Sequence, residues 1–172
     1  MVKKKNFANN QQSQKFVDSI PTTTIEDSEI EKKCKFNLAY FDGTQAARQD
    51  FGQWDHTVGI TSLKNLLDKF KEYTDQPLTY WQHQRVGGGG LKVLELYGDF
   101  PSKSDFEHPK HVPIDAYWAR FRLGNKVRLI GFTISKEAIK NLKADEQDKF
   151  CHNTFYVVFL DKEHKFYKTE QA

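Results

Sequence analysis

The sequence predicts an α+β fold: an antiparallel sheet of four to six strands, with two or three helices packed on one face and a mobile N-terminal tail. Three observations support this prediction. The first 33 residues have few apolar side chains and no period, helical spacing is clearest before residue 84, and alternating apolar runs dominate the second half. Because helices and strands are segregated along the chain, the helices should cover one sheet face and leave the other partly open.

The length and composition fit one folded domain behind a tail. We expect a flexible tail at residues 1–33 and a single α+β domain at 34–172 of the 172-residue chain. Hydrophobic residues make up 38%, and the 14 phenylalanines are the main core filler. A net charge of +3 permits nucleic-acid binding without requiring it. The basic residues are nevertheless concentrated between 108 and 131, where five lysines and arginines accompany one acid.

The first half of the domain predicts one strand and two helices. Residues 35–41 alternate apolar side chains as a strand does, and 42–59 form a polar loop or short helix. The apolar positions of 63–73 follow helical spacing, with Thr61 and Ser62 as candidate N-caps. A second short helix is expected after Pro77.

Glycine and proline divide the next segment. The run Gly87–Gly90 lacks the Gly-Lys-Ser/Thr ending of a phosphate loop and precedes a strand, so we interpret it as a flexible connection. A strand is expected at 91–97. The polar stretch 98–113 contains three prolines and is expected to be a connection, because proline cannot continue a central strand ladder.

Two hairpins are predicted near the C-terminus. In the first, residues 116–132, Gly124 and Asn125 separate two apolar runs and tolerate the positive φ of a two-residue turn. The second covers residues 154–167 and closes the chain. Between them, Ser135 is expected to cap a brief helix to about residue 143, followed by a charged loop at 144–153.

The first hairpin carries the candidate functional residues. Arg120 and Arg122 lie two residues apart and therefore project from one face of a strand, with Arg128 on the partner strand. Fixed guanidinium groups bind phosphate well. RNA can be cut without a metal when a base takes the 2′-hydroxyl proton, a cation stabilises the phosphorane and an acid protonates the leaving oxygen. His164 and Tyr167 are the candidate acid–base groups in the second hairpin.

Other chemistry has weak support. No Gly-x-Ser-x-Gly motif indicates a hydrolase, and His108 and His111 lack the further ligands that zinc requires, so neither a metal nor a cofactor is expected. Cys34 and Cys151 are far apart and form no CxxC motif, which favours reduced thiols. With no signal-peptide pattern and no apolar run long enough for a membrane span, we expect a cytoplasmic protein with no membrane partner.

Residues 120–132 and 155–167 resemble the C-terminal half of RelE/HigB-type toxins, small bacterial proteins of toxin–antitoxin systems. The resemblance implies an α+β endoribonuclease that cleaves mRNA, often on the ribosome, and that a protein antitoxin silences. It implies that Arg120 or Arg122 holds phosphate, that Arg128 is the basic residue of the paired strand, and that His164, Lys165 and Tyr167 supply acid–base or base-stacking groups. The predicted site residues are therefore Arg120, Arg122, Arg128, His164 and Tyr167 for catalysis, and Lys110, Lys126 and Lys165 for RNA binding.

The chain also departs from the family. It is longer than a typical member, and Asp161 and Glu163 lie beside the proposed site, where they would weaken the attraction to RNA. The alternative is a non-catalytic binding module of a mobile element or phage, which uses the same sheet to hold a protein or nucleic-acid partner. Arginines that alternate with core residues also occur on ordinary half-exposed sheets.

Overall fold

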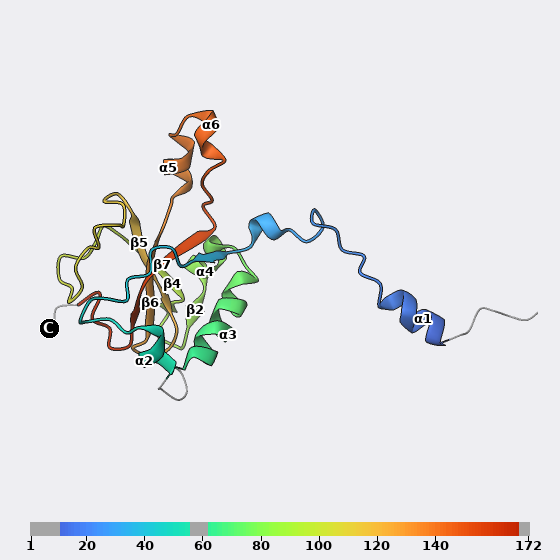
Figure 1. Cartoon of the computed structure of the whole chain (residues 1–172), viewed down its shortest axis with the longest axis horizontal. Coiled ribbons are helices and arrows are strands. Elements are labelled where there is room, and N and C mark those ends of the chain that lie inside the picture. The colour runs from blue at the N-terminus through green and yellow to red at the C-terminus, as the bar shows by residue number, and fades with distance from the viewer. Residues whose placement is uncertain (1–10, 56–61, 169–172) are drawn as a thin grey trace, which may run out of the picture. The chain divides into compact units, whose positions relative to one another are not determined.

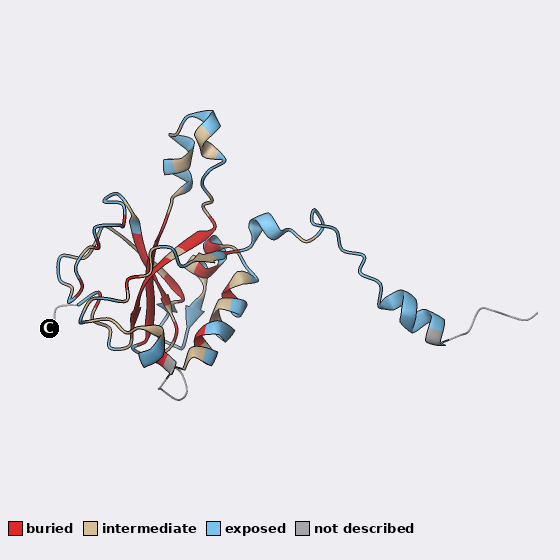
Figure 2. Ribbon diagram, in the orientation of Figure 1, coloured by how far each residue is buried: buried red, intermediate tan, exposed pale blue. Residues whose placement is uncertain are grey.

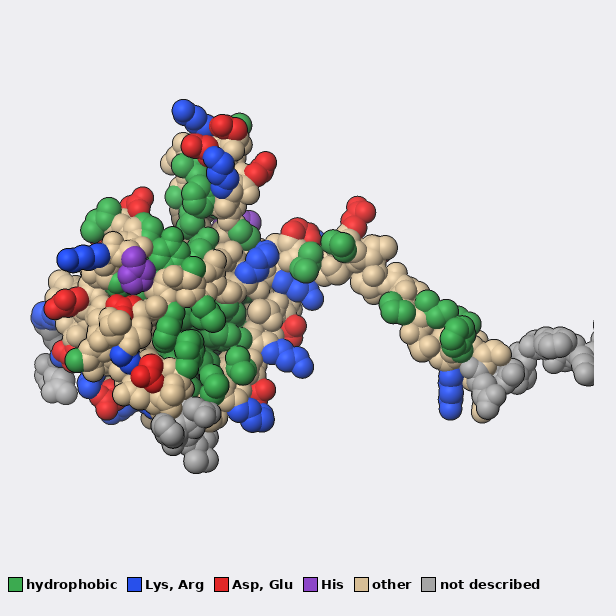
Figure 3. Space-filling view, viewed as in Figure 1, with side chains coloured by type: hydrophobic (Ala, Val, Ile, Leu, Met, Phe, Trp, Pro, Cys, Tyr) green, Lys and Arg blue, Asp and Glu red, His purple; other side chains and the backbone are tan. Residues whose placement is uncertain are grey.

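The computed structural model describes residues 11–55 and 62–168 (Figure 1). Contacts between residues divide the chain into two units, 1–31 and 32–172. The first ten residues of the predicted tail lie outside the described residues. Residues 11–18 form a helix, α1 (Gln11–Asp18), where the sequence showed no helical period. Hydrophobic side chains of this N-terminal segment, among them Phe16 and Ile25, are exposed (Figure 3).

A five-stranded sheet forms the centre of the second unit, and the predicted α+β class and strand number are confirmed. The strand order is β1-β7-β6-β5-β4. Their bounds are β1 Lys35–Asn37, β4 Leu94–Gly98, β5 Tyr117–Arg122, β6 Arg128–Thr133 and β7 Thr154–Asp161. Strands β4 to β7 are antiparallel neighbours, whereas β1 pairs with β7 in parallel, so the sheet is mixed.

A second sheet has two strands, which come just before β4 in the chain. Strands β2 (Arg85–Val86) and β3 (Leu91–Lys92) pair antiparallel, and Gly87–Gly90 join them. Gly87 and Gly90 have φ of 68° and 67°, a region that glycine adopts without strain. The glycine run is therefore a hairpin loop between two short strands.

Short helices surround the central sheet. They are α2 (Phe51–Asp55), α3 (Leu63–Thr74), α4 (Leu78–His83), α5 (Lys136–Lys140) and α6 (Ala144–Gln147), with a 3₁₀ turn, η1, at Ile30–Lys32. The Ser62 hydroxyl accepts from the Asn65 amide at the start of α3, and Ser135 caps α5 in the same way. Thr61, the other candidate cap, lies outside the described residues. Helix α6 lies within the segment predicted as a charged loop.

The two faces of the sheet are covered differently. On one face, Leu66 and Tyr73 of α3 and Trp81 of α4 pack against Phe121 and Phe155. The ribbon in Figure 2 shows the strands of the sheet as mostly buried. On the other face, Trp118, Ile130 and Phe159 are covered by aromatic side chains from connections, chiefly Phe106 and Phe166. The second face was predicted to be partly open, and these aromatic side chains cover much of it. Its open part lies beside the β5–β6 turn.

The β5–β6 hairpin forms as predicted, but its turn does not. Arg122 and Arg128 are the last paired residues of the two strands, and the Leu123 amide donates to the Val127 carbonyl beyond them. This leaves a loop longer than two residues. Neither Gly124 nor Asn125 has a positive φ. A longer loop does not need the left-handed residues of a two-residue turn.

The predicted second hairpin is wrong. Strand β7 ends at Asp161, and residues 162–168 form a loop and not a returning strand. The carboxylate of Asp161 explains this, because it accepts hydrogen bonds from the amides of Glu163 and Lys165 at 3.1 Å and of Phe166 at 2.9 Å. These amides turn inward to one side chain and are unavailable to a strand ladder.

Candidate functional site

The pairing of β4, β5, β6 and β7 sets the positions of the charged residues. Arg122 lies opposite Arg128, Arg120 lies opposite Glu95 of β4, and Arg128 lies opposite Asp161 of β7. Since alternate residues of a strand share a face, all five side chains lie on the face opposite α3 and α4. The sequence predicted this shared face for the arginines.

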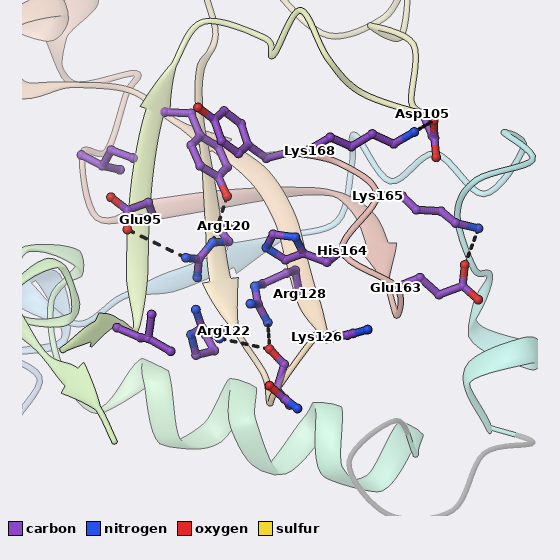
Figure 4. Close-up of a pocket in the computed structure, with 15 residues that line it drawn as sticks. Glu95, Asp105, Arg120, Arg122, Lys126, Arg128, Glu163, His164, Lys165 and Lys168 are labelled. Carbon is purple, nitrogen blue, oxygen red and sulfur yellow. Dashed lines mark hydrogen bonds and ion pairs between the residues drawn. The ribbon is translucent and has the colours of Figure 1, made fainter. Parts of the chain in front are cut away.

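A single pocket of about 1120 Å³ contains most of the predicted site (Figure 4). Its lining includes all five predicted catalytic residues, which come from β5, β6 and the loop after β7. Two of the predicted RNA-binding lysines, Lys126 and Lys165, also line it. Lys110, the third, is exposed and is not among the lining residues. We call this cavity the arginine pocket.

Arg120 is buried and held by β4. Its Nε donates to the Tyr97 hydroxyl at 2.9 Å, and its Nη2 lies 3.8 Å from the Glu95 carboxylate. Glu95 is shared with Lys92, whose Nζ is closer to it, at 2.8 Å. The carboxylate is thus only a partial counter-charge for Arg120. The guanidinium group is fixed in place, as a phosphate-binding group must be.

Arg128 and Arg122 brace the hairpin loop. Arg128 Nη1 donates to the carbonyls of Gly124, Asn125 and Val127, at 2.8–3.0 Å. Arg122 Nη1 donates to Asn125 at 3.1 Å. Arg128 is nearly fully buried, and its contacts explain how the loop satisfies its carbonyls without a tight turn. Its main contact role is structural, and its charge adds to the field of the pocket.

The three guanidinium groups repel one another. Burial, together with the charges of Arg120 and Arg122, lowers the pKa of Arg128 to about 10. Burial and the nearby charge of Arg120 also lower the pKa of Arg122. Groups of like charge stay this close only where the surrounding fold holds them, which is typical of binding sites.

His164 lies over the arginines on the loop that Asp161 organises. Its φ of 61° is left-handed, and this is uncommon for a residue other than glycine. Burial first, and then the charge of Arg128, lower the pKa of His164, while Asp161 opposes the shift. The imidazole is therefore neutral at pH 7 and can accept a proton. Figure 4 shows it beside Arg128 and Arg120.

Tyr97 and Tyr167 form an aromatic wall of the pocket. Their rings stack with centroids 4.8 Å apart and planes at 4°, and Tyr167 is 41% exposed. Burial raises the pKa of Tyr97, so the phenol keeps its proton at neutral pH. The open ring of Tyr167 offers a stacking surface for a nucleobase.

Two lysines at the rim are paired with acids. Lys165 forms an ion pair with Glu163, and Lys168 forms one with Asp105, and both pairs are drawn in Figure 4. The Glu163 partner raises the pKa of Lys165, and the lysine lowers that of Glu163. Exposed pairs of this kind contribute little charge to a ligand. Glu163 therefore faces Lys165 and not the arginines.

The roles of three residues that shape the site were not predicted from the sequence. Tyr97 and Glu95 hold Arg120 from β4, and Asp161 fixes the loop of His164. The alternation of β4 could have placed Glu95 and Tyr97 on one face. The buried role of Asp161 had no such signal, because an Asp followed by Lys and Glu also fits an exposed turn.

The described residues contain no group of three or more His, Cys, Asp and Glu side chains suited to holding a metal ion. His108 and His111 serve separate contacts: His108 packs at the edge of Trp118, and His111 Nε2 lies 3.1 Å from the Tyr40 carbonyl. Burial raises the pKa of Cys34 to about 12, which makes it an inert core thiol. Within the described segments no helix is long and apolar enough to cross a membrane.

Fold and site together define the class: an α+β protein with an arginine-lined pocket suited to an anion. Comparisons with known proteins add no family to this description. No family model matches the chain, and neither the curated proteins nor the solved structures contain a significant match. The likeness to RelE/HigB-type toxins therefore remains a prediction from residues 120–132 and 155–167.

Proposed function

We propose that the protein is a metal-independent endoribonuclease that cuts RNA by acid–base chemistry. The observation that carries the proposal is the convergence of Arg120, Arg122, Arg128, His164 and Tyr167 in one pocket. These residues come from three separate parts of the chain. Tyr97, whose phenol keeps its proton, lines the same pocket. The groups that metal-free RNA cleavage requires, namely fixed cations, a neutral imidazole and a protonated phenol, therefore lie together there.

Arg120 and Arg122 hold the scissile phosphate in this mechanism. Arg120 is positioned by Tyr97 and Glu95, and Arg122 is the most accessible of the three arginines. Their fixed charges stabilise the phosphorane, whose negative charge exceeds that of the bound diester. Arg128 keeps the loop in place and adds positive charge behind them.

His164 acts as the base and Tyr97 as the acid. The 2′-oxygen forms a bond to phosphorus as its proton passes to the neutral imidazole of His164. The bond between phosphorus and the 5′-oxygen breaks, and that oxygen takes the phenolic proton of Tyr97. The Tyr97 hydroxyl accepts from Arg120, so its proton remains free to be donated. The products are a 2′,3′-cyclic phosphate and a 5′-hydroxyl, and the two side chains then exchange protons with water.

The biological setting follows from the resemblance to RelE/HigB-type toxins. In this proposal the substrate is mRNA, including mRNA bound to the ribosome, in the bacterial cytoplasm. A protein antitoxin would silence the enzyme. The N-terminal segment, with Phe16 and Ile25 exposed, offers hydrophobic side chains to such a partner.

One observation favours the alternative, a binding module without catalysis. One nitrogen of Arg128 donates to three loop carbonyls. Lys165 and Lys168 both form ion pairs with acids. These residues therefore stabilise the protein as well as line the pocket. A module that only holds RNA or another anion would have the same contacts.

Cleavage of a labelled RNA by the purified protein in EDTA tests the proposal. We expect 2′,3′-cyclic phosphate ends from the wild type. Loss of one phosphate-holding arginine in Arg122→Ala should slow cleavage on the order of a hundredfold. His164→Asn should do the same without straining the loop, since asparagine tolerates the left-handed φ of 61°.

The matched control is Lys110→Ala, which removes an exposed lysine that does not line the pocket. Its rate should equal that of the wild type. Induced expression should arrest growth with the wild type and with Lys110→Ala, and not with His164→Asn. No cleavage by any of the proteins would favour the binding module, and equal cleavage by the wild type and His164→Asn would refute the role given to His164.

A further inference from the structure

The arginine pocket carries more positive charge than one phosphodiester can neutralise. The lining holds six lysines and arginines, Arg120, Arg122, Lys126, Arg128, Lys165 and Lys168, against three acids, Glu95, Asp105 and Glu163, which leaves an excess of three positive charges. Lys92, paired with Glu95, and Asp161, opposite Arg128, lie outside this lining and offset each other. The carboxylate of Asp161 is already engaged by three backbone amides. At the rim, Lys165 and Lys168 are balanced by their own acids.

Each guanidinium group also has an unsatisfied nitrogen. Arg120 Nη1, Arg122 Nε and Arg128 Nε are buried and have no hydrogen-bond partner. A charged donor without an acceptor costs more than a neutral one, so both the charge and the hydrogen bonding of the pocket favour an anionic ligand. Small rotations of these side chains around a ligand with several anionic oxygens would relieve both.

We propose that the arginine pocket is a binding site for the dianion of a terminal phosphate monoester, namely the 3′-phosphate end of cut RNA, and holds it more tightly than an internal phosphodiester. The source of this ligand rests on the proposed function, because hydrolysis of the 2′,3′-cyclic phosphate produces such an end. The binding preference itself does not require that the protein cut RNA.

The phosphodiester and the phosphate monoester differ in charge and in the number of acceptor oxygens, the two properties to which the arginines respond. A diester has one negative charge and two terminal oxygens, whereas a monoester has nearly two charges at pH 7 and three strong acceptor oxygens. Three oxygens match three guanidinium groups, and two charges neutralise more of the excess in the pocket than one charge does. At about 1120 Å³ the pocket admits a whole nucleotide. The attached base can stack on Tyr167, at the outer end of the Tyr97 stack.

The functional consequence is retention of the product. After cleavage and hydrolysis, the 3′-phosphate would remain in the pocket and block the next substrate. The 5′-hydroxyl fragment carries no terminal charge and would leave first. Free nucleoside 3′-monophosphates would then act as inhibitors, whereas nucleosides would not.

Calorimetric binding to the full-length protein tests this with ligands that cannot be cut. The probes are 2′-deoxyuridine 3′-monophosphate, its methyl ester, and 2′-deoxyuridine 3′,5′-bis(methyl phosphate), which carries two diesters. At pH 7.5 the monoester should bind about tenfold or more tightly than the methyl ester, because it brings a second charge close to the arginines. This advantage should shrink below pH 6, where the monoester gains a proton.

The charged and titratable groups that face the ligand keep the pH test interpretable. The strands and their hairpin contribute Glu95 and Tyr97 of β4, Arg120 and Arg122 of β5, Lys126 of the β5–β6 loop and Arg128 of β6. The connections contribute Asp105 before β5 and Glu163, His164, Lys165, Tyr167 and Lys168 after β7, with Asp161 of β7 opposite Arg128. The methyl ester experiences the same groups and corrects for their titration. Arg122→Gln should reduce monoester binding more than ester binding, and Lys110→Gln should change neither.

The outcomes separate this inference from the proposed function. Equal affinity for monoester and methyl ester, or binding of the bis-diester as tight as that of the monoester, would overturn the inference even if RNA is cut. Tight, pH-dependent monoester binding by a protein that cuts no RNA would support the inference and refute the nuclease. Arg122→Gln is the informative variant because Arg122 is partly exposed and its loss should leave the fold intact.

Discussion

Asp161 shows how a single residue can decide what a segment becomes. Its buried carboxylate gathers three amides of the following loop and holds His164 at a φ of 61° above the arginines. From the sequence, Asp161 and Glu163 were expected to repel RNA. In the structure, backbone amides engage Asp161 and Lys165 engages Glu163, and the weaker attraction to RNA stays a prediction.

We predict that Asp161→Asn destabilises the fold by about 2 kcal/mol or more. The amide has one acceptor oxygen instead of two and no charge, so buried amides of the loop lose their partners. Urea unfolding measures the effect. Glu163→Gln is the matched control, since it removes a neighbouring carboxylate from an exposed ion pair and should leave the midpoint unchanged. An Asp161→Asn midpoint equal to that of the control would contradict the role given to this carboxylate.

At the scale of elements, the sequence pattern predicted those helices and strands whose formation depends on residues close together in the chain. The β5–β6 hairpin, α3 with its Ser62 cap, and the placement of three arginines on one face all follow from residues close together in the chain. The prediction of the second hairpin was wrong because it used only the alternation of apolar and polar residues after Asp161. The Asp161 carboxylate instead binds the backbone amides that a returning strand would need. The parallel pairing of β1 with β7 joins residues 35 and 154, and no local pattern contains that information.

Gly131 marks the element most sensitive to a small change. It lies where the β6–β7 register shifts, and an added Cβ would lie 2.1 Å from the Tyr156 carbonyl oxygen and 2.6 Å from the Phe155 ring. Gly131→Ala should therefore cost about 2–4 kcal/mol in the free energy of unfolding, since backbone and a fully buried ring must move. Thermal or urea unfolding measures it.

Gly88→Ala is the control for that substitution. Nothing lies within 4 Å of the Cβ that alanine would add at Gly88, and its φ is not positive. The variant should match or slightly exceed the wild type, because alanine reduces the entropy of the unfolded chain. Similar losses in both variants would mean that the register shift at Gly131 tolerates a side chain.

At the scale of the whole molecule, the folded unit and the site occupy residues 32–172 alone. The predicted site residues and the residues that hold them all belong to this unit. We predict that removing residues 1–31 leaves the unfolding midpoint and the binding of 2′-deoxyuridine 3′-monophosphate unchanged. Circular dichroism and calorimetry measure the two properties. A lower midpoint would show that the N-terminal unit supports the fold.

A longer truncation provides the contrast. Removing residues 1–37 also deletes β1, the parallel neighbour of β7. Strand β7 would lose one of its two partners and become an edge strand, so the midpoint should fall clearly. Equal midpoints for the two truncations would mean that β1 adds little to the sheet.

The sequence suggested that the arginines could lie near His164 and Tyr167, but it did not contain the strand order that brings them together. The chain fixes which strand faces carry charge, but the order β7-β6-β5-β4 decides which of these faces meet. Lys110 illustrates the limit: it is basic and close in sequence, yet it lies outside the pocket.

The parallel pair β1–β7 has a kinetic consequence. It brings together residues 35 and 154, which loop closure must unite against a large entropy cost. The loop of His164 begins at the other end of β7, where Asp161 pairs with Arg128 of β6, so its anchor forms only once β7 has joined the sheet. An early folding intermediate that contains only the β4–β6 meander would therefore have its arginines in place while the imidazole is still unplaced, and any nuclease activity would appear last.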